Sequence, residues 1–581
     1  MEQLSQKELY DEWLEKIKTA ECRYSDYYKL ISEIREYYRN DRKKNKQNIF
    51  WSSVETMKPF LYFKQPKPFV IRNNKKSDKV EATACKILER ALAWDMRQFD
   101  FDSVIKYARN DFLLSGMGIL WEQYRPTFQC IGDIMVKDNE QVDTVYISPT
   151  DFLTDTEKVN VWEDVEWIAR KTYMTFDELV YCFGENIVNT FNINPAVVGG
   201  ICIYEIWDKK TKKIYYLSPE CYGHFLRVNN DTLHLSGFFP IPKPIMSTLS
   251  NDGIIPVPDY VEIKSLLEEL DGVNERMRLL MQAIKVSGCY DNSFPALANI
   301  LNKDVTLISV SDFDSLREVG GLKGILDFIP IEQYVSALQI LAERRKLLIE
   351  AIYEVTGVSD IMRGSSNDKD TATAVLQKTN FGTLRNQDRQ NDMQRFIRDL
   401  LKIKAEIICE QFSPEKLASF ISQNENVSVE IINNAIRLLK TEKIREMTIE
   451  IETETSFNQT QEEEKILRVL QHIHTTINQA FTVVSQQPAL LPLYRQMIEA
   501  AVTTIPNARQ FEGVMEDVFT NISNELNKPE QSNPVPQNDM IKLEQQKVNQ
   551  DFIIKKEQNQ LKREELELKK ITEQNKLNTR K

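Results

Sequence analysis

Two long helical patterns follow one another between Glu332 and Phe412, separated by a short polar segment. In the first pattern, apolar side chains recur at steps of three, four or seven residues. Because an α-helix turns once every ~3.6 residues, this spacing places them on one face. A basic turn of Arg344, Arg345 and Lys346 interrupts that apolar stripe. The apolar members are Tyr334, Leu338, Leu341, Leu348, Ile352 and Val355.

The first helix is predicted to end at Gly357, because glycine readily adopts the left-handed conformation that helix ends often need. The second can begin near Asp370, whose carboxylate can cap free amides, and no proline follows until Pro414. This leaves room for about forty helical residues, or roughly 60 Å, so the helix is expected to cross a large structure. Gly382 is its expected kink, because glycine costs about 1 kcal/mol relative to alanine inside a helix.

The rest of the chain combines helices with a strand-rich segment, so the predicted fold class is α+β and predominantly helical. Short strands dominate from 125 to 255, where Thr175 and Glu178 have the spacing of a capping box. Alternation of apolar and polar side chains predicts a late strand at 447–455 that returns to this strand-rich region. Further helical periodicity is found at 1–45, 79–114, 260–285 and 458–528.

Length and charge narrow the classes of function. With 581 residues the chain is too long for one core and is expected to form about two to four regions. Its 86 acidic and 74 basic residues give a formal charge of −12. The whole protein is therefore not a basic nucleic-acid binder, although DNA can slide along such a surface without sticking. The basic run at 39–46 is interpreted as a solvated hinge or, alternatively, as a contact with DNA or a partner.

The sequence contains no pattern that indicates catalysis, a metal site or a cofactor. Eight cysteines without C-x-x-C spacing indicate reduced thiols of a cytoplasmic product. His472 and His474 are two residues apart, so they do not share a helix face as a metal-binding pair would. The motifs G-x-S-x-G, G-x-x-x-x-G-K-[ST] and H-E-x-x-H are absent, which predicts a protein that is not an enzyme. Gly116 and Gly118 follow a helix and precede a strand, the reverse of a phosphate-binding turn, and are predicted to be packing residues.

Targeting and membrane signals are also lacking. The N-terminus is polar from Glu2 onward, so we expect no signal peptide. No apolar run approaches the roughly 20 residues of a membrane-spanning helix, so we expect folding in a cytoplasm.

Several segments of the central region have the order and spacing seen in one viral family. They are Thr356-Gly-Val-Ser-Asp-Ile-Met-Arg-Gly364, then Thr371-Ala-Thr-Ala, then the segment 385–398. On these segments, residues 344–412 resemble portal proteins of tailed bacteriophages, most closely the short-tailed type. In that family the corresponding parts are a stem helix, a loop facing a central channel, and a long kinked helix that crosses a ring.

The resemblance implies a ring of about twelve copies at one capsid vertex, closed by cyclic symmetry. Double-stranded DNA would pass through it during packaging and ejection, and the ring would act as conduit and gate. It would dock a large terminase motor, capsid and scaffold proteins, and tail or head-completion proteins. It would be assembled in the bacterial host cytoplasm and end in the virion, with no cofactor and no membrane involved.

Two other classes stay open. A non-conducting structural adaptor or coiled-coil scaffold protein of a virion or ring assembly explains the helices but not the strand-rich middle. A nuclease or protease would need a clustered acidic or thiol site.

The resemblance also implies a division of the chain into portal-like regions. These are an N-terminal helical region (1–47), an α+β wing (48–258), a first stem helix (259–287), a small α/β clip (288–330), a second stem helix (331–357), a channel loop (358–370), a long kinked helix (371–412), a return to the wing (413–456), a helical crown (457–530) and a C-terminal helical tail (531–581). The tail is interpreted either as a solvated helix or as part of a bundle formed by several subunits.

The candidate functional residues follow from this division. An acidic channel wall repels phosphate, while rings of Arg or Lys can brake or centre the duplex. Arg363 can instead pair with Asp360 to stabilise its own loop. The candidates are Ser359, Asp360, Arg363 and Lys369 facing the channel, Arg344, Arg345 and Lys346 on the stem, and Gly382 at the kink.

Overall fold

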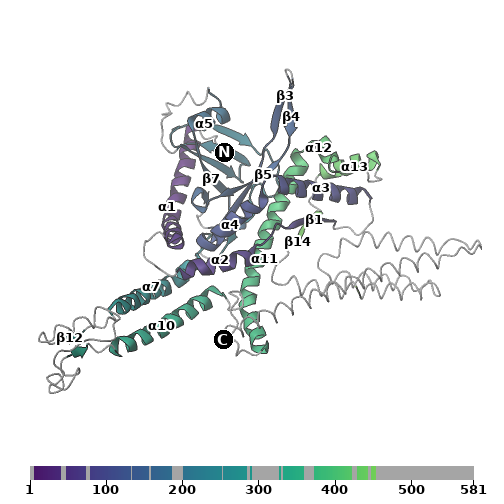
Figure 1. The fold of residues 1–581 in the computed structure, drawn as a ribbon. Coiled ribbons are helices and arrows are strands. Elements are labelled where there is room, and N and C mark those ends of the chain that lie inside the picture. The colour runs from purple at the N-terminus through teal and green to yellow at the C-terminus, as the bar shows by residue number, and fades with distance from the viewer. Residues whose placement is uncertain are drawn as a thin grey trace, which may run out of the picture. The chain divides into compact units, whose positions relative to one another are not determined.

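The computed structural model describes residues 6–40, 48–72, 79–131, 134–155, 159–185, 200–250, 253–283, 288–290, 326–328, 332–358, 372–421, 428–441, 447–452 and 471. The chain divides into two compact units, Met1–Glu462 and Glu463–Lys581. Because Gln471 is the one described residue of the second unit, the fold given below is that of the first (Figure 1). The regions predicted as crown and tail lie outside the described residues, apart from Gln471.

Helices predominate in the described part of the chain, which contains ten α-helices and fourteen strands. Every strand pair formed by these residues is antiparallel. The predicted class, a mixed α+β fold in which helices predominate, is therefore confirmed.

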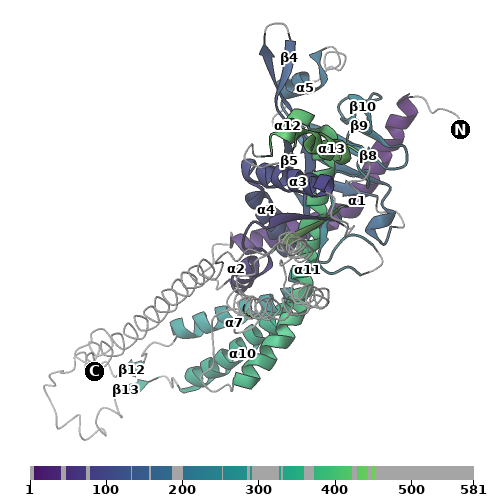
Figure 2. The same cartoon turned by 90° about the vertical axis from the view of Figure 1, so that its right-hand side faces the viewer.

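A five-stranded sheet in the order β10-β9-β8-β7-β6 packs against the N-terminal helix α1, Gln6–Arg39 (Figures 1 and 2). Aromatic side chains form much of this contact. The ring centroids of Trp13 and Trp167 lie 5.8 Å apart, and Tyr10 donates a hydrogen bond to the Ser218 carbonyl at 2.8 Å. The strands are β6 Phe152–Thr154, β7 Trp167–Met174, β8 Ile201–Asp208, β9 Lys213–Leu217 and β10 Arg227–Asn230.

The helical periodicity at 79–114 corresponds to two helices, which corrects the single pattern seen in the sequence. Helix α3 spans Lys79–Gln98 and α4 spans Phe101–Ser115. The chain breaks at Asp100, whose φ of 46° lies in the left-handed region that aspartate tolerates better than most residues. Apolar side chains continue on both sides of the break, so the periodicity alone did not reveal it.

A three-stranded sheet, β11-β2-β5, follows α4 directly. Gly116 ends α4 with a φ of 80°, and a Cβ added at Gly118 would overlap the Ala108 carbonyl oxygen. The prediction that Gly116 and Gly118 are packing residues is therefore confirmed. The strands of this sheet are β2 Met117–Tyr124, β5 Val142–Ile147 and β11 Ile245–Met246.

Smaller elements complete the body of this unit. The predicted capping box is confirmed, since the Thr175 side chain and Glu178 exchange hydrogen bonds with each other's backbone amides at the start of α5. Strand β14 forms in the predicted place, but it pairs with β1 in a separate two-stranded ladder and not with the five-stranded sheet. The elements are α2 Ile49–Leu61, β1 Lys67–Arg72, β3 Thr127–Ile131, β4 Ile134–Asn139, η1 Pro149–Asp151, η2 Trp162–Asp164, α5 Phe176–Phe183, α12 Pro414–Ala418, α13 Val429–Leu439 and β14 Met447–Glu452.

Two helices lie side by side and lead away from the elements described so far. We call this pair of helices the stem and the other elements of the unit the body. The stem helices are α7, Asp259–Ala283, and α10, Glu332–Thr356 (Figure 2). Between them in the sequence, β12 Gly288–Tyr290 pairs with β13 Leu326–Phe328. The 40-residue helix α11, Ala372–Gln411, then crosses the body and contacts α2, α3, β2 and β5.

Candidate functional site

Apolar side chains hold one end of the stem to the body. On α7, Ile263, Leu267 and Leu270 are buried, and on α10 Leu348 and Ile352 are buried. Farther out, Val273 is still buried, and Met277 and Leu341 are partly buried against the same core. The large apolar side chains left exposed on the two helices are Val261 and, farther out, Leu279 at 51%, Met281 at 65%, Val335 at 44%, Ile340 at 68% and Leu347 at 51%.

The basic turn of α10 is used mainly to join the two stem helices. Arg344 donates from Nε and Nη2 to the two carboxylate oxygens of Glu269 on α7, at 2.8 and 3.0 Å. Arg345 Nε donates to Asn274 Oδ1 at 3.0 Å. Lys346 is 76% exposed, and its ammonium lies 3.8 Å from a carboxylate of the same helix. Of the three stem candidates, Lys346 therefore has the side chain that extends farthest into solvent.

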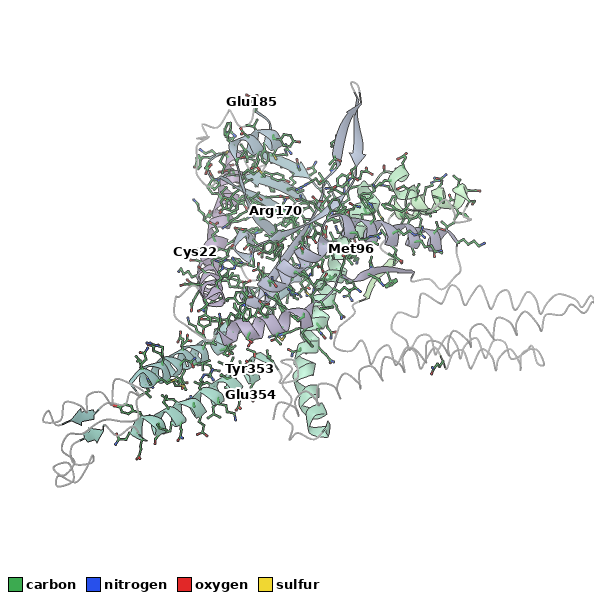
Figure 3. The ribbon with its side chains drawn as sticks, viewed as in Figure 1. Cys22, Met96, Arg170, Glu185, Tyr353 and Glu354 are labelled. Atoms are coloured by element: carbon green, nitrogen blue, oxygen red, sulfur yellow. The ribbon has the colours of Figure 1, made fainter. Side chains whose placement is uncertain are left out.

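The channel-loop candidates Ser359, Asp360, Arg363 and Lys369 lie outside the described residues. The start of the loop is described, and Gly357 has a φ of 72°, as predicted for the end of this helix. Figure 3 labels Tyr353 and Glu354 where α10 approaches the body. The Tyr353 carbonyl accepts a hydrogen bond from the amide of the buried Val358 at 3.1 Å.

Gly382 lies within α11, which is helical on both sides of it. The kink at this position stays a prediction.

Helix α11 connects the stem to the body through three polar side chains within five residues. Asn386 Nδ2 donates to the Gly357 carbonyl at the end of α10, at 3.0 Å. Arg389 pairs with Asp259 at the start of α7, with an Nη2 to Oδ2 distance of 2.7 Å. These contacts bring the ends of both stem helices onto one segment of α11. In addition, Gln390 Nε2 donates to the Phe60 carbonyl of α2 at 2.7 Å.

Farther along, α11 carries a buried charge into the body. The Lys404 ammonium lies 2.6 Å from Asp95 Oδ2 on α3 and 3.2 Å from Glu122 Oε2 on β2. It also donates to the Val142 carbonyl on β5. Asp95 and Glu122 have fully buried side chains, and that of Lys404 is 1% exposed. Asp95 precedes Met96 in α3, which Figure 3 labels.

Burial and mutual attraction oppose each other in this cluster. Burial raises the pKa of Glu122 to about 7, against the opposing effects of Lys404 and Thr144. Burial alone would lower the pKa of Lys404, but attraction to Glu122 and Asp95 outweighs it and leaves that pKa above its ordinary value. Lys404 therefore stays charged at neutral pH, whereas Glu122 gains or loses its proton near neutral pH.

Neither this cluster nor the three polar contacts of α11 were predicted from the sequence. A signal for Lys404 is present, because it interrupts an apolar stripe with helical spacing. The stripe comprises Ile397, Leu400, Leu401, Ala405 and Ile408, all buried. The partners of Lys404 come from α3 and β2, about 300 residues earlier in the chain, so no local pattern reveals them.

The described residues also bear on metal binding and on membrane insertion. No group of three or more His, Cys, Asp or Glu side chains in them could hold a metal ion. None of the described helices is both long and apolar enough to cross a membrane.

The chain matches no protein-family model and no curated protein.

Proposed function

We propose that this chain is the subunit of a phage portal, a ring at one capsid vertex that conducts and gates double-stranded DNA. The observation that carries the proposal is the order of three elements. A pair of stem helices encloses a small strand-containing insertion, and a 40-residue helix then crosses the body. This is the order in the portal proteins that the sequence resembles.

The stem surface supports assembly into a ring. Five exposed apolar side chains lie beyond the part of the stem that the body covers: Leu279, Met281, Val335, Ile340 and Leu347. Exposed apolar surface of this kind is stabilised when another chain covers it. Because the exposed positions lie on both helices, α7 of one copy can pack against α10 of the next. Such a head-to-tail contact closes into a ring when the rotation between copies allows it.

The charge of the stem supports a conduit to which DNA does not adhere. Helix α7 carries six acidic and three basic residues and α10 carries four acidic and three basic residues, so the described stem is acidic on balance. A wall with this charge repels phosphates, so the duplex can move along it. The exposed acidic residues are Glu262, Glu268, Glu269 and Glu275.

The proposed mechanism is passive guidance and gating. The chain would supply the conduit, and a separate large terminase would supply the motor. Helix α11 contacts both stem helices through Asn386 and Arg389, and it reaches the body core through Lys404. A change in the channel loop, which lies between α10 and α11 in the sequence, can therefore reach the body through one continuous helix. The clip would dock the motor and later the tail or head-completion proteins.

The experiment replaces the exposed stem face and measures oligomeric mass. Ile340 and Leu347 are seven residues apart, so they share one face of α10. We expect wild type to form a closed oligomer of about twelve copies and Ile340→Glu/Leu347→Glu to give smaller species. The control is Val429→Glu, since Val429 is 73% exposed on α13, outside the stem.

Native mass spectrometry with sedimentation distinguishes the outcomes. Wild type that stays monomeric or dimeric at high concentration would refute the ring and favour the non-conducting adaptor. Equal loss of oligomer in the stem variant and in Val429→Glu would show that the stem face is not the interface.

A further inference from the structure

The Lys404 cluster contains more negative than positive charge. One ammonium and two carboxylates meet where α11, α3 and β2 converge, with the backbone of β5 completing the site. With all three groups ionised, the buried cluster carries a net charge of −1. Burying an uncompensated charge is unfavourable, so a proton on one carboxylate relieves the imbalance.

The hydrogen bonds indicate which carboxylate takes the proton. Asp95 accepts from Lys404 Nζ at 2.6 Å on one oxygen and from the Val142 amide at 3.1 Å on the other. Glu122 accepts from Thr144 Oγ1 at 2.8 Å, and its second oxygen lies 3.2 Å from Lys404 Nζ, farther than the Asp95 oxygen. Close donors stabilise the charged form of a carboxylate, so Glu122, whose contact with Lys404 is the longer one, is the carboxylate that takes the proton.

Other charged groups around the cluster do not cancel this imbalance. Asp143 of β5 adds negative charge near Lys404 and Asp95, and it is itself paired with Arg125 at 3.2 Å. The ring of Phe101 on α4, 5.9 Å from the Lys404 ammonium, is uncharged. The charge of the site therefore depends on the proton of Glu122.

We propose that the Lys404, Asp95 and Glu122 cluster is a proton-dependent latch that holds α11 in the body. With Glu122 neutral, the Lys404 and Asp95 charges balance and the helix is held firmly. When Glu122 loses its proton, the buried site gains an uncompensated negative charge and the hold weakens. Because the same helix contacts both stem helices through Asn386 and Arg389, the latch contributes to the hold of the body on the stem, beside the buried apolar side chains of the stem.

The latch is independent of the portal proposal, since it concerns the packing of α11 within one chain. A chain that fails to form rings can still contain the latch, and rings can form without it. Oligomeric mass and local helix opening are measured separately, so failure of one is distinguishable from failure of the other.

The test is hydrogen exchange of the full-length chain, read on peptides covering residues 396–411 and corrected for intrinsic exchange. If Glu122 takes its proton near neutral pH only while α11 is seated, protection of these peptides falls about tenfold from about pH 6 to about pH 8. Glu122→Gln removes the titrating group, so its protection is expected to be the same at both pH values. Glu275→Gln, an exposed change of the same kind on α7, is expected to keep the wild-type pH dependence.

A gentler variant covers the case in which Glu122→Gln fails to fold. Thr144→Val removes the hydroxyl that donates to the Glu122 carboxylate, so the midpoint of the change moves to higher pH. An unchanged midpoint in Thr144→Val would overturn the latch. So would a wild-type chain whose protection does not vary with pH, or a pH dependence that persists in Glu122→Gln.

Discussion

Replacing Lys404 by methionine removes the cation of the buried cluster. Among the described residues, it is the one ammonium that forms ion pairs with both Asp95 and Glu122. Methionine is also unbranched and of similar length, but it leaves two carboxylates and the Val142 carbonyl without their ammonium partner. Removing one member of a buried ion pair costs about 3–5 kcal/mol, because the remaining charge is uncompensated. We therefore expect Lys404→Met to lower the free energy of unfolding by about 3–5 kcal/mol.

Tryptophan fluorescence can measure this loss of unfolding free energy for the unit that contains Lys404. All seven tryptophans lie between Trp13 and Trp207, so the signal reports on the unit Met1–Glu462 and not on the second unit. Denaturant titration of full-length wild type and variant gives the difference in the free energy of unfolding, provided that the slopes agree.

Two further variants separate the buried charge from a general effect of the substitution. Lys402→Met changes an exposed lysine of the same helix and is expected to alter the free energy by less than about 0.5 kcal/mol. The triple variant Lys404→Met/Asp95→Asn/Glu122→Gln removes all three charges and is expected to recover at least about half of the loss. A loss of less than about 1 kcal/mol for Lys404→Met, or a loss no larger than that of Lys402→Met, would refute the role of the buried charge.

Three further predictions concern pH, packing and the long helix. Burial holds the pKa of Glu122 at about 7 against an ordinary value of 4.5, so the folded chain keeps a proton that the unfolded chain has lost. Stability is therefore lost as pH rises through this range, by about 3 kcal/mol in denaturant titrations, and the loss should be absent in Glu122→Gln. Gly118→Ala should cost about 1–3 kcal/mol by the same assay, because its Cβ meets the Ala108 carbonyl, whereas Gly237→Ala has open space around it. Gly382→Ala should straighten α11, and unchanged helix geometry together with unchanged DNA packaging in phage would contradict its proposed role.

Periodicity was sufficient to locate the longest helices. The stem helices were predicted at 260–285 and 331–357, and they span Asp259–Ala283 and Glu332–Thr356. The long helix begins at Ala372, two residues after the predicted cap at Asp370. These elements have sustained apolar stripes and clear end signals, so the information lies in nearby residues.

Long-range pairing was not accessible in the same way. The break at Asp100 depends on a left-handed backbone between two apolar runs that continue one helical pattern. The pairing of β14 with β1 joins segments about 380 residues apart. Alternation of apolar and polar residues predicts a strand but not the strand with which it pairs. The Lys404 cluster likewise depends on the convergence of three separate elements in space.

The central claim is that the stem and long helix build a ring with a channel. Electron microscopy of the purified chain with three-dimensional reconstruction tests it most directly. We predict rings of about twelve copies, with stems side by side around a central opening near the width of a DNA duplex. Particles that are monomers, dimers or open filaments, or rings whose stems do not face a central opening, would contradict the account.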